Sequence, residues 1–175
     1  MFYVRRETAV NQWDDVRELW SGSLAPIPAH LVGPHVSAGT AAFLIAVGLP
    51  IEHPLEFTFY HDERLLNPAV RGERTFIVFG DDTGTVPFAI ERGREEVFSL
   101  YPDGPFMFIN STIADFVYCY GLFSQRVERI VQTPFADRKP LVDELRGLIA
   151  ARDPEALDPD DLLAWWDSLL EPYEQ

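Results

Sequence analysis

The chain has 175 residues, of which 47% are apolar and 24% charged, and these values are typical of a single globular domain. Its 28 acidic and 14 basic residues give a net charge of −14, which argues against nucleic acid and anionic membranes as direct partners. No apolar run approaches the roughly 18 residues of a membrane span, and the single cysteine, Cys119, excludes an internal disulfide. We therefore expect a cytoplasmic protein.

The negative charge is concentrated at the C-terminal end. Residues 137–175 contain 11 acids and 4 bases, whereas the 136 residues before them contain 17 acids and 10 bases. We predict one domain over residues 1–175, with a core at about 36–131 and an acidic helical extension at about 137–175.

The N-terminal part predicts two helices. Residues 10–20 place large apolar side chains at helical spacing, and a second apolar face follows within residues 36–47. Gly48 is suited to a left-handed C-cap, and Pro50 prevents the helix from continuing.

Beyond residue 54 the apolar period becomes that of strands. Runs of strand length occur at 55–61, 74–80, 84–92, 95–101 and 106–109. Asp81-Asp82-Thr83-Gly84 and Arg92-Gly93 are turn sequences between them, so we predict an antiparallel meander. Pro87 cannot donate to a ladder, so its strand should be bulged or at an edge there.

Helical spacing returns after Thr112 and continues in two C-terminal segments. Residues 113–131, 141–149 and 162–170 each carry an apolar stripe. Asp158 and Pro159 are a natural N-cap and first-turn pair for the last helix. Trp165 and Trp166 lie on its apolar stripe, which predicts that they pack inside the protein.

The junction Asn110-Ser111-Thr112 raises the question of a nucleophile. A nucleophile elbow needs glycines in a G-x-S-x-G pattern, and this sequence has isoleucines at those positions. Thr112 and Asp115 instead have the T-x-x-D spacing of a capping box. We predict that Asn110, Ser111, Thr112 and Asp115 form the hinge at which a strand becomes a helix. The glycosylation sequon at Asn110 matters only in a secreted chain.

Other catalytic patterns are weak. Asp82-Thr83-Gly84 resembles the loop of an aspartic protease, but a hairpin turn accounts for it. None of the four histidines has the spacing of a zinc site, and His61-Asp62 is the best of poor metal candidates. No phosphate-binding glycine loop is present. We predict no catalytic residue, no cofactor and no metal.

The central part of the chain resembles the SUKH superfamily, the fold of immunity proteins found beside bacterial polymorphic toxins and of some eukaryotic scaffold proteins. The resemblance rests on these segments in this order: FLIAVGLP (43–50), LEFTF (55–59), FIVFGDDTG (76–84), PFAIERGREEVFSLY (87–101) and FINSTIADF (108–116). It implies an α+β fold, with a small antiparallel sheet flanked by N-terminal and C-terminal helices. It also implies a non-catalytic protein that binds and neutralises a cognate toxin.

The net charge suggests how such binding would work. An acidic surface could compete for the basic cleft of a toxin that acts on nucleic acids. The acids that we expect on this surface are Asp62, Asp81, Asp82, Glu91, Glu95, Glu96 and Asp103. Two alternatives stay open: a scaffold domain of the same fold, and a small hydrolase that uses Asp81, Asp82 or Glu91 as acid and base.

Overall fold

The computed structural model describes residues 12–51, 57–82, 84–102, 104–157 and 164–174. The α-helices in these ranges are α1 (Asp14–Trp20), α2 (Ala38–Ala46), α3 (Ile113–Gln132), α4 (Lys139–Arg152) and α5 (Trp165–Leu170). The strands are β1 (Leu24–Ala25), β2 (Leu49–Pro50), β3 (Phe57–Phe59), β4 (Pro68–Arg71), β5 (Arg74–Asp82), β6 (Val86–Glu91), β7 (Val97–Leu100) and β8 (Phe106–Asn110). The 3-10 helices are η1 (Ala29–Leu31), η2 (Glu63–Leu66), η3 (Phe135–Asp137), η4 (Pro154–Leu157) and η5 (Glu171–Tyr173).

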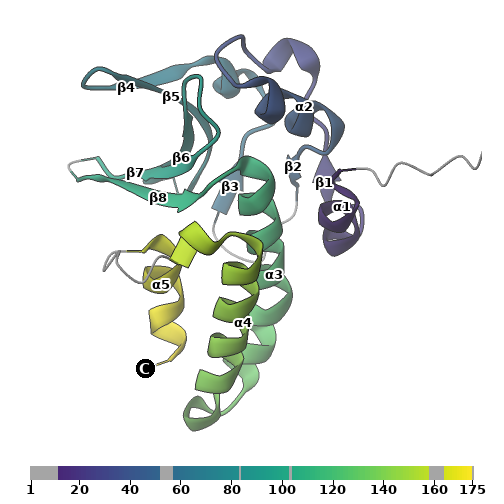
Figure 1. Cartoon of the computed structure of the whole chain (residues 1–175), viewed down its shortest axis with the longest axis vertical. Helices are drawn as coiled ribbons and strands as arrows, with labels where there is room; N and C mark the ends of the chain where they lie inside the picture. The colour runs from purple at the N-terminus through teal and green to yellow at the C-terminus, as the bar shows by residue number, and fades with distance from the viewer. Residues whose placement is uncertain (1–11, 52–56, 83, 103, 158–163, 175) are drawn as a thin grey trace, which may run out of the picture.

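The main sheet is antiparallel throughout. Its order is β3-β5-β6-β7-β8, and β4 pairs with β5 beside β3. The two outer strands share one side of β5, because β3 pairs with residues 80–82 and β4 with residues 74–77. Figure 1 shows this sheet at one end of the molecule, with α3 and α4 running side by side away from it. The predicted α+β class, with helices around an antiparallel sheet, is confirmed.

One face of the sheet packs against α3. The ring of Phe116 on α3 lies 5.5 Å from that of Phe79 on β5 and 5.6 Å from that of Phe88 on β6. The same buried cluster contains Val142, Leu145 and Ile149 of α4 and Trp165, Trp166 and Leu170 of α5. The predicted internal packing of the two tryptophans is confirmed, and the C-terminal helices share the core of the sheet.

The other face of the sheet is strongly curled. Phe76 on β5 and Phe106 on β8 are three strands apart, a separation of roughly 14 Å in a flat sheet. Their ring centroids are 4.9 Å apart, so two corners of the sheet fold toward each other. The guanidinium of Arg71, in β4, also donates to the carbonyl of Pro102, between β7 and β8, at 3.3 Å. A second, smaller apolar cluster therefore forms on the side away from α3.

Most predicted elements are present, with differences that have local causes. Gly48, which follows the C-cap residue Val47 of α2, has a φ of 90°, as a left-handed cap requires, and a Cβ atom there would lie 1.7 Å from the carbonyl oxygen of Ala25. Pro87 lies just beyond the β6–β7 ladder, which ends at Phe88, so β6 is locally an edge there, as predicted. The structure adds β4, which the sequence analysis did not predict.

The boundaries of the first and last helices differ from the prediction. Helix α1 begins at Asp14, later than predicted, and α5 begins at Trp165. The predicted cap at Asp158 and Pro159 lies outside the described residues. None of the described helices is both long and apolar enough to cross a membrane.

Candidate functional site

The strand-helix junction is built around the N-terminus of α3. Thr112 has extended backbone angles and occupies the N-cap position. Its hydroxyl accepts a hydrogen bond from the backbone N–H of Asp115 at 3.1 Å and donates to the Asp115 carboxylate at 2.6 Å. The cap satisfies one N–H that the first helical turn leaves without a partner, and it places an acid near the positive end of the helix.

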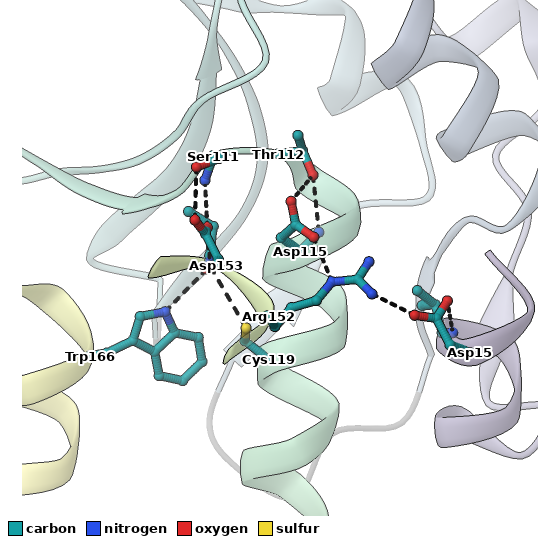
Figure 2. Close-up of polar contacts among 10 residues, drawn as sticks. Asp15, Ser111, Thr112, Asp115, Cys119, Arg152, Asp153 and Trp166 are labelled. Atoms are coloured by element: carbon teal, nitrogen blue, oxygen red, sulfur yellow. Dashed lines mark hydrogen bonds and ion pairs between the residues drawn. The ribbon is translucent and has the colours of Figure 1, made fainter. Parts of the chain in front are cut away.

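The neighbouring residues converge on a buried acid of another element. Asp153, the C-cap residue of α4, is only 3% exposed. Its carboxylate accepts hydrogen bonds from the Ser111 hydroxyl at 2.8 Å, the Ser111 backbone N–H at 2.7 Å and the Asn110 amide at 2.9 Å. Figure 2 shows the two bonds from Ser111 to this carboxylate. Three donors compensate for much of the cost of removing a carboxylate from water.

Asn110 extends this polar cluster into the core. Its amide oxygen accepts from the indole N–H of Trp166 at 3.1 Å, and its amide nitrogen lies 3.8 Å from the sulfur of Cys119. Burial raises the pKa of the Cys119 thiol to about 12, and the negative charge of Asp153 adds to the effect. The thiol is therefore protonated at neutral pH, as expected for a buried structural cysteine.

A second, more exposed branch begins at Arg152. Its guanidinium donates to the carboxylate of Asp115 at 2.6 Å and also to Asp15 on α1. The same group lies 4.5 Å from the centre of the Tyr118 ring. The bonds to Asp115 and Asp15, drawn in Figure 2, connect α1, α3 and α4 around the start of α3.

The arrangement is that of a structural junction. Within the described residues, the Ser111 hydroxyl donates to a carboxylate, and the Thr112 hydroxyl donates to a carboxylate and accepts from a backbone N–H, so neither is bonded to an imidazole. The N–H of Ser111, which would be a natural oxyanion donor, is already bonded to Asp153. The cluster thus holds β8, α3, α4 and α5 together, and its geometry supplies no activated nucleophile.

The acids predicted for a partner surface fall into two groups, and the first lies near the end of β3. Asp81 is buried, and its carboxylate accepts from the Tyr60 hydroxyl and from the Gly84 backbone N–H. Burial, together with the bond to Asp81, raises the pKa of Tyr60 to about 12. Asp82 is half-buried, and its carbonyl accepts from the Thr85 N–H at 2.8 Å.

Asp62, at the start of η2, is exposed but already paired. It forms an ion pair of 2.8 Å with Arg64, whose guanidinium also stacks 3.9 Å from the centre of the Tyr60 ring. Hydrogen bonds from Arg64 lower the pKa of Asp62 to about 2. The nearby metal candidate His61 contacts the carbonyl of Pro50 at 3.1 Å. Within the described residues, His, Cys, Asp and Glu side chains form no group of three that could hold a metal ion.

The second group lies around the β6–β7 turn. Glu91 binds the guanidinium of Arg74 through both carboxylate oxygens, at 2.9 and 2.6 Å, and also contacts Arg94 at 3.3 Å. The bond to Arg74 lowers the pKa of Glu91. Glu95 accepts from the Ser37 hydroxyl at 2.9 Å, and Glu96 lies 3.7 Å from Arg94. Asp103 lies outside the described residues.

The two groups are separated along the β5–β6 ladder. Asp81 is opposite Pro87, whereas Glu91 is opposite Phe76 at the other end of the pairing. These carboxylates therefore do not converge as the acid and base of a hydrolase would need to.

Two residues of the junction were absent from the sequence analysis. Asp153 stands directly before Pro154 at the end of an apolar helical stripe. An exposed acid at a helix end would give the same pattern, so the sequence does not indicate that Asp153 is buried. Arg152 looks like an ordinary basic residue in the last turn of a helix. Their hydrogen-bonding partners are between 37 and 137 residues away in the sequence, so no local pattern could identify them.

In a comparison with known protein families, the model described as SUKH-4 immunity protein matches residues 22–172. No match was found among curated proteins or solved structures. The matched range includes the whole main sheet, the junction around Ser111 and the C-terminal helices.

Proposed function

Because this chain belongs to the SUKH-4 immunity protein family, we propose that it binds a cognate protein toxin and neutralises it without chemistry of its own. The family match over residues 22–172 is the observation that carries the proposal. The toxin would be met in the cytosol of the cell that produces both proteins. No cofactor is needed for this function.

The junction around Ser111 supports a non-catalytic role. The Ser111 hydroxyl donates to the buried Asp153 and the Thr112 hydroxyl donates to Asp115, so both hydroxyls take part in contacts that stabilise the junction of sheet and helices. A rigid fold of this kind suits inhibition by occlusion, because a preformed surface loses little conformational entropy on binding.

We further propose that the toxin acts on nucleic acids and that acidic side chains here compete for its basic cleft. The net charge of −14 supports this proposal, because it attracts cationic surfaces over long range. Among the seven candidate acids, Glu95 should contribute most, since it is exposed on the β6–β7 turn and accepts from the Ser37 hydroxyl. Glu96 is half-buried and lies 3.7 Å from Arg94, so its contribution should be smaller. Asp62 and Glu91 should contribute less, because arginines already compensate their charges, and Asp81 is buried.

A growth experiment tests the proposal. The gene next to that of this protein is read for a large toxin with a variable C-terminal domain, and that domain is expressed in a sensitive cell, with and without this protein. We expect growth arrest without it, growth with it, and recovery of a complex of the two proteins. Continued arrest despite abundant folded protein, with no complex recovered, would refute the proposed function.

A further inference from the structure

Strand β4 is a short edge strand with an exposed apolar centre. It contains four residues, Pro68–Arg71, and pairs with β5 on one side. Its central residue, Val70, is 67% exposed, the largest value among the exposed large apolar side chains of the described residues. Figure 1 shows β4 at the rim of the sheet, at the end away from α4 and α5. The strand at the opposite edge, β8, is contacted by η4 and α5.

The register of the β4–β5 hairpin shows which backbone groups point outward. Arg71 pairs with Arg74 across the two-residue turn Gly72-Glu73, in which Gly72 has a φ of 60°. The closing pair of such a turn is hydrogen-bonded, and hydrogen-bonded and non-hydrogen-bonded pairs then alternate. The next pair, Val70 with Thr75, is therefore non-hydrogen-bonded.

The pairing of β5 with β6 is consistent with this alternation of hydrogen-bonded and non-hydrogen-bonded pairs. The carbonyl of Thr75 accepts from the backbone N–H of Arg92 at 2.8 Å, so it is directed toward β6 and away from β4. The N–H and C=O of Val70 consequently point to the free edge. In the described part of the chain, neither group has a hydrogen bond outside the β4–β5 ladder. Pro68 has no N–H, so Val70 supplies the outward donor at the centre of the strand.

From this geometry we infer that an extended segment of the toxin adds to the sheet as a strand beside β4, with Val70 as the central hydrogen-bonding residue. The inference rests on the proposed function, and it identifies the free edge of β4 as the surface that binds the toxin. Strand addition uses backbone bonds for affinity and neighbouring side chains for specificity. It requires outward backbone groups without a partner, and in this short strand, which begins with a proline and ends with an arginine, Val70 offers them.

Charge identifies the kind of segment that fits. The charges around β4 are of both signs: Glu63 and Glu73 are exposed acids, whereas Arg71 lies in β4 itself, and Arg64 and Arg74 are paired with Asp62 and Glu91. Because the whole chain carries −14, we expect the segment to belong to a cationic toxin surface and to place a β-branched or aromatic residue opposite Val70. A second copy of this chain is disfavoured as the occupant, because two molecules of charge −14 repel each other.

The test compares two substitutions at one position. Val70→Pro removes the outward N–H, and because that N–H is not part of the β4–β5 ladder, the hairpin should persist. Val70→Thr keeps the N–H and the β-branched shape and serves as the matched control. We expect Val70→Pro to weaken binding of the adjacent-gene toxin domain about tenfold and Val70→Thr to change it less than about threefold. Circular dichroism and thermal melts establish that both variants are folded.

Hydrogen exchange on the unmodified protein gives a readout that needs no variant. The Val70 amide should exchange rapidly in the free protein and become protected in the complex. Equal affinities of Val70→Pro and the unmodified protein, or an unprotected Val70 amide in a saturated complex, would overturn the inference while the proposed function stands. A self-association that Val70→Pro abolishes, with toxin binding unchanged, would assign the edge to a second copy and overturn it as well. Absence of any toxin binding by the unmodified protein would instead defeat the proposed function itself.

Discussion

Ser111 and Asp153, 42 residues apart in the sequence, are joined by two hydrogen bonds, one from the Ser111 hydroxyl and one from its backbone N–H. Through this pair the end of the sheet is attached to the end of α4. The hydroxyl that most resembles a candidate nucleophile in the sequence is thus a donor to a buried structural acid.

The first prediction concerns the buried acid. Asp153→Ala leaves the Ser111 N–H, the Ser111 hydroxyl and the Asn110 amide without this acceptor. We expect the free energy of unfolding to fall by about 3 kcal/mol, since unsatisfied buried donors are costly. Urea denaturation measures the change. Glu144→Gln, an exposed acid on the same helix, is the control and should change stability by less than about 0.5 kcal/mol. Equal effects of the two substitutions would contradict the structural role of Asp153.

Ser111→Ala separates a structural hydroxyl from a catalytic one. The change removes one hydrogen bond and should lower the free energy of unfolding by about 1 kcal/mol. Toxin neutralisation by the folded variant should remain equal to that of the unmodified protein. Binding titrations at a temperature well below both melting transitions make the comparison. A variant that is folded and binds the toxin but no longer neutralises it would point to chemistry at Ser111.

The prediction for Cys119 follows from its raised pKa. With a pKa of about 12 in place of 9.0, the folded thiol holds its proton at pH 8, so alkylation should be far slower than in the unfolded chain. The unfolded thiol ionises above pH 9 whereas the folded one does not, so this group makes stability fall as pH rises from about 9 to about 12. Iodoacetamide labelling followed by mass spectrometry, with and without urea, checks the first part. Rapid labelling of the folded protein would contradict the burial of the thiol.

Electrostatic attraction is tested by the double substitution Glu95→Gln with Glu96→Gln. Removing these two charges, of which Glu95 is exposed and Glu96 half-buried, should slow association with a basic toxin about threefold at low salt and change dissociation little. The difference should disappear as salt shortens the Debye length to a few ångströms. Stopped-flow measurements at several ionic strengths provide the rates. Asp62→Asn is the comparison, and its effect should be smaller because Arg64 already pairs with that acid. Association that is independent of salt would contradict the proposal of an acidic surface.

The sequence predicts elements well where one apolar period extends over many residues. Helix α3 begins close to the position that the change of period after Thr112 predicts, because 20 residues of amphipathic pattern and a side-chain cap act together. Strand β4 was missed because Pro-Ala-Val-Arg is short, begins with proline and has no alternation. Its strand character comes from pairing with β5, which is a property of the fold and not of the segment.

For the candidate sites too, contacts between residues close in the sequence could be predicted, whereas contacts that depend on the fold could not. The cap at Thr112 can be expected from a three-residue spacing, since its partner lies within the same turn of helix. The burial of Asp153 depends on how α4 meets the end of β8, and the pairing of Glu91 with Arg74 depends on strand register. Neither relationship leaves a trace in the local sequence. Charged residues that look equivalent in the sequence therefore differ in the charge that they present to a partner.

The most direct test of the central claim is a stoichiometric titration of toxin activity. A fixed concentration of the toxin domain, well above the dissociation constant, is mixed with increasing amounts of this protein and its residual activity is measured. Inhibition by binding predicts that toxin activity falls linearly as this protein is added and reaches zero at a fixed, small molar ratio of this protein to toxin. Active toxin should be recovered once the complex is separated. Complete loss of activity at a small fraction of that ratio, with the toxin recovered in a covalently altered form, would contradict it.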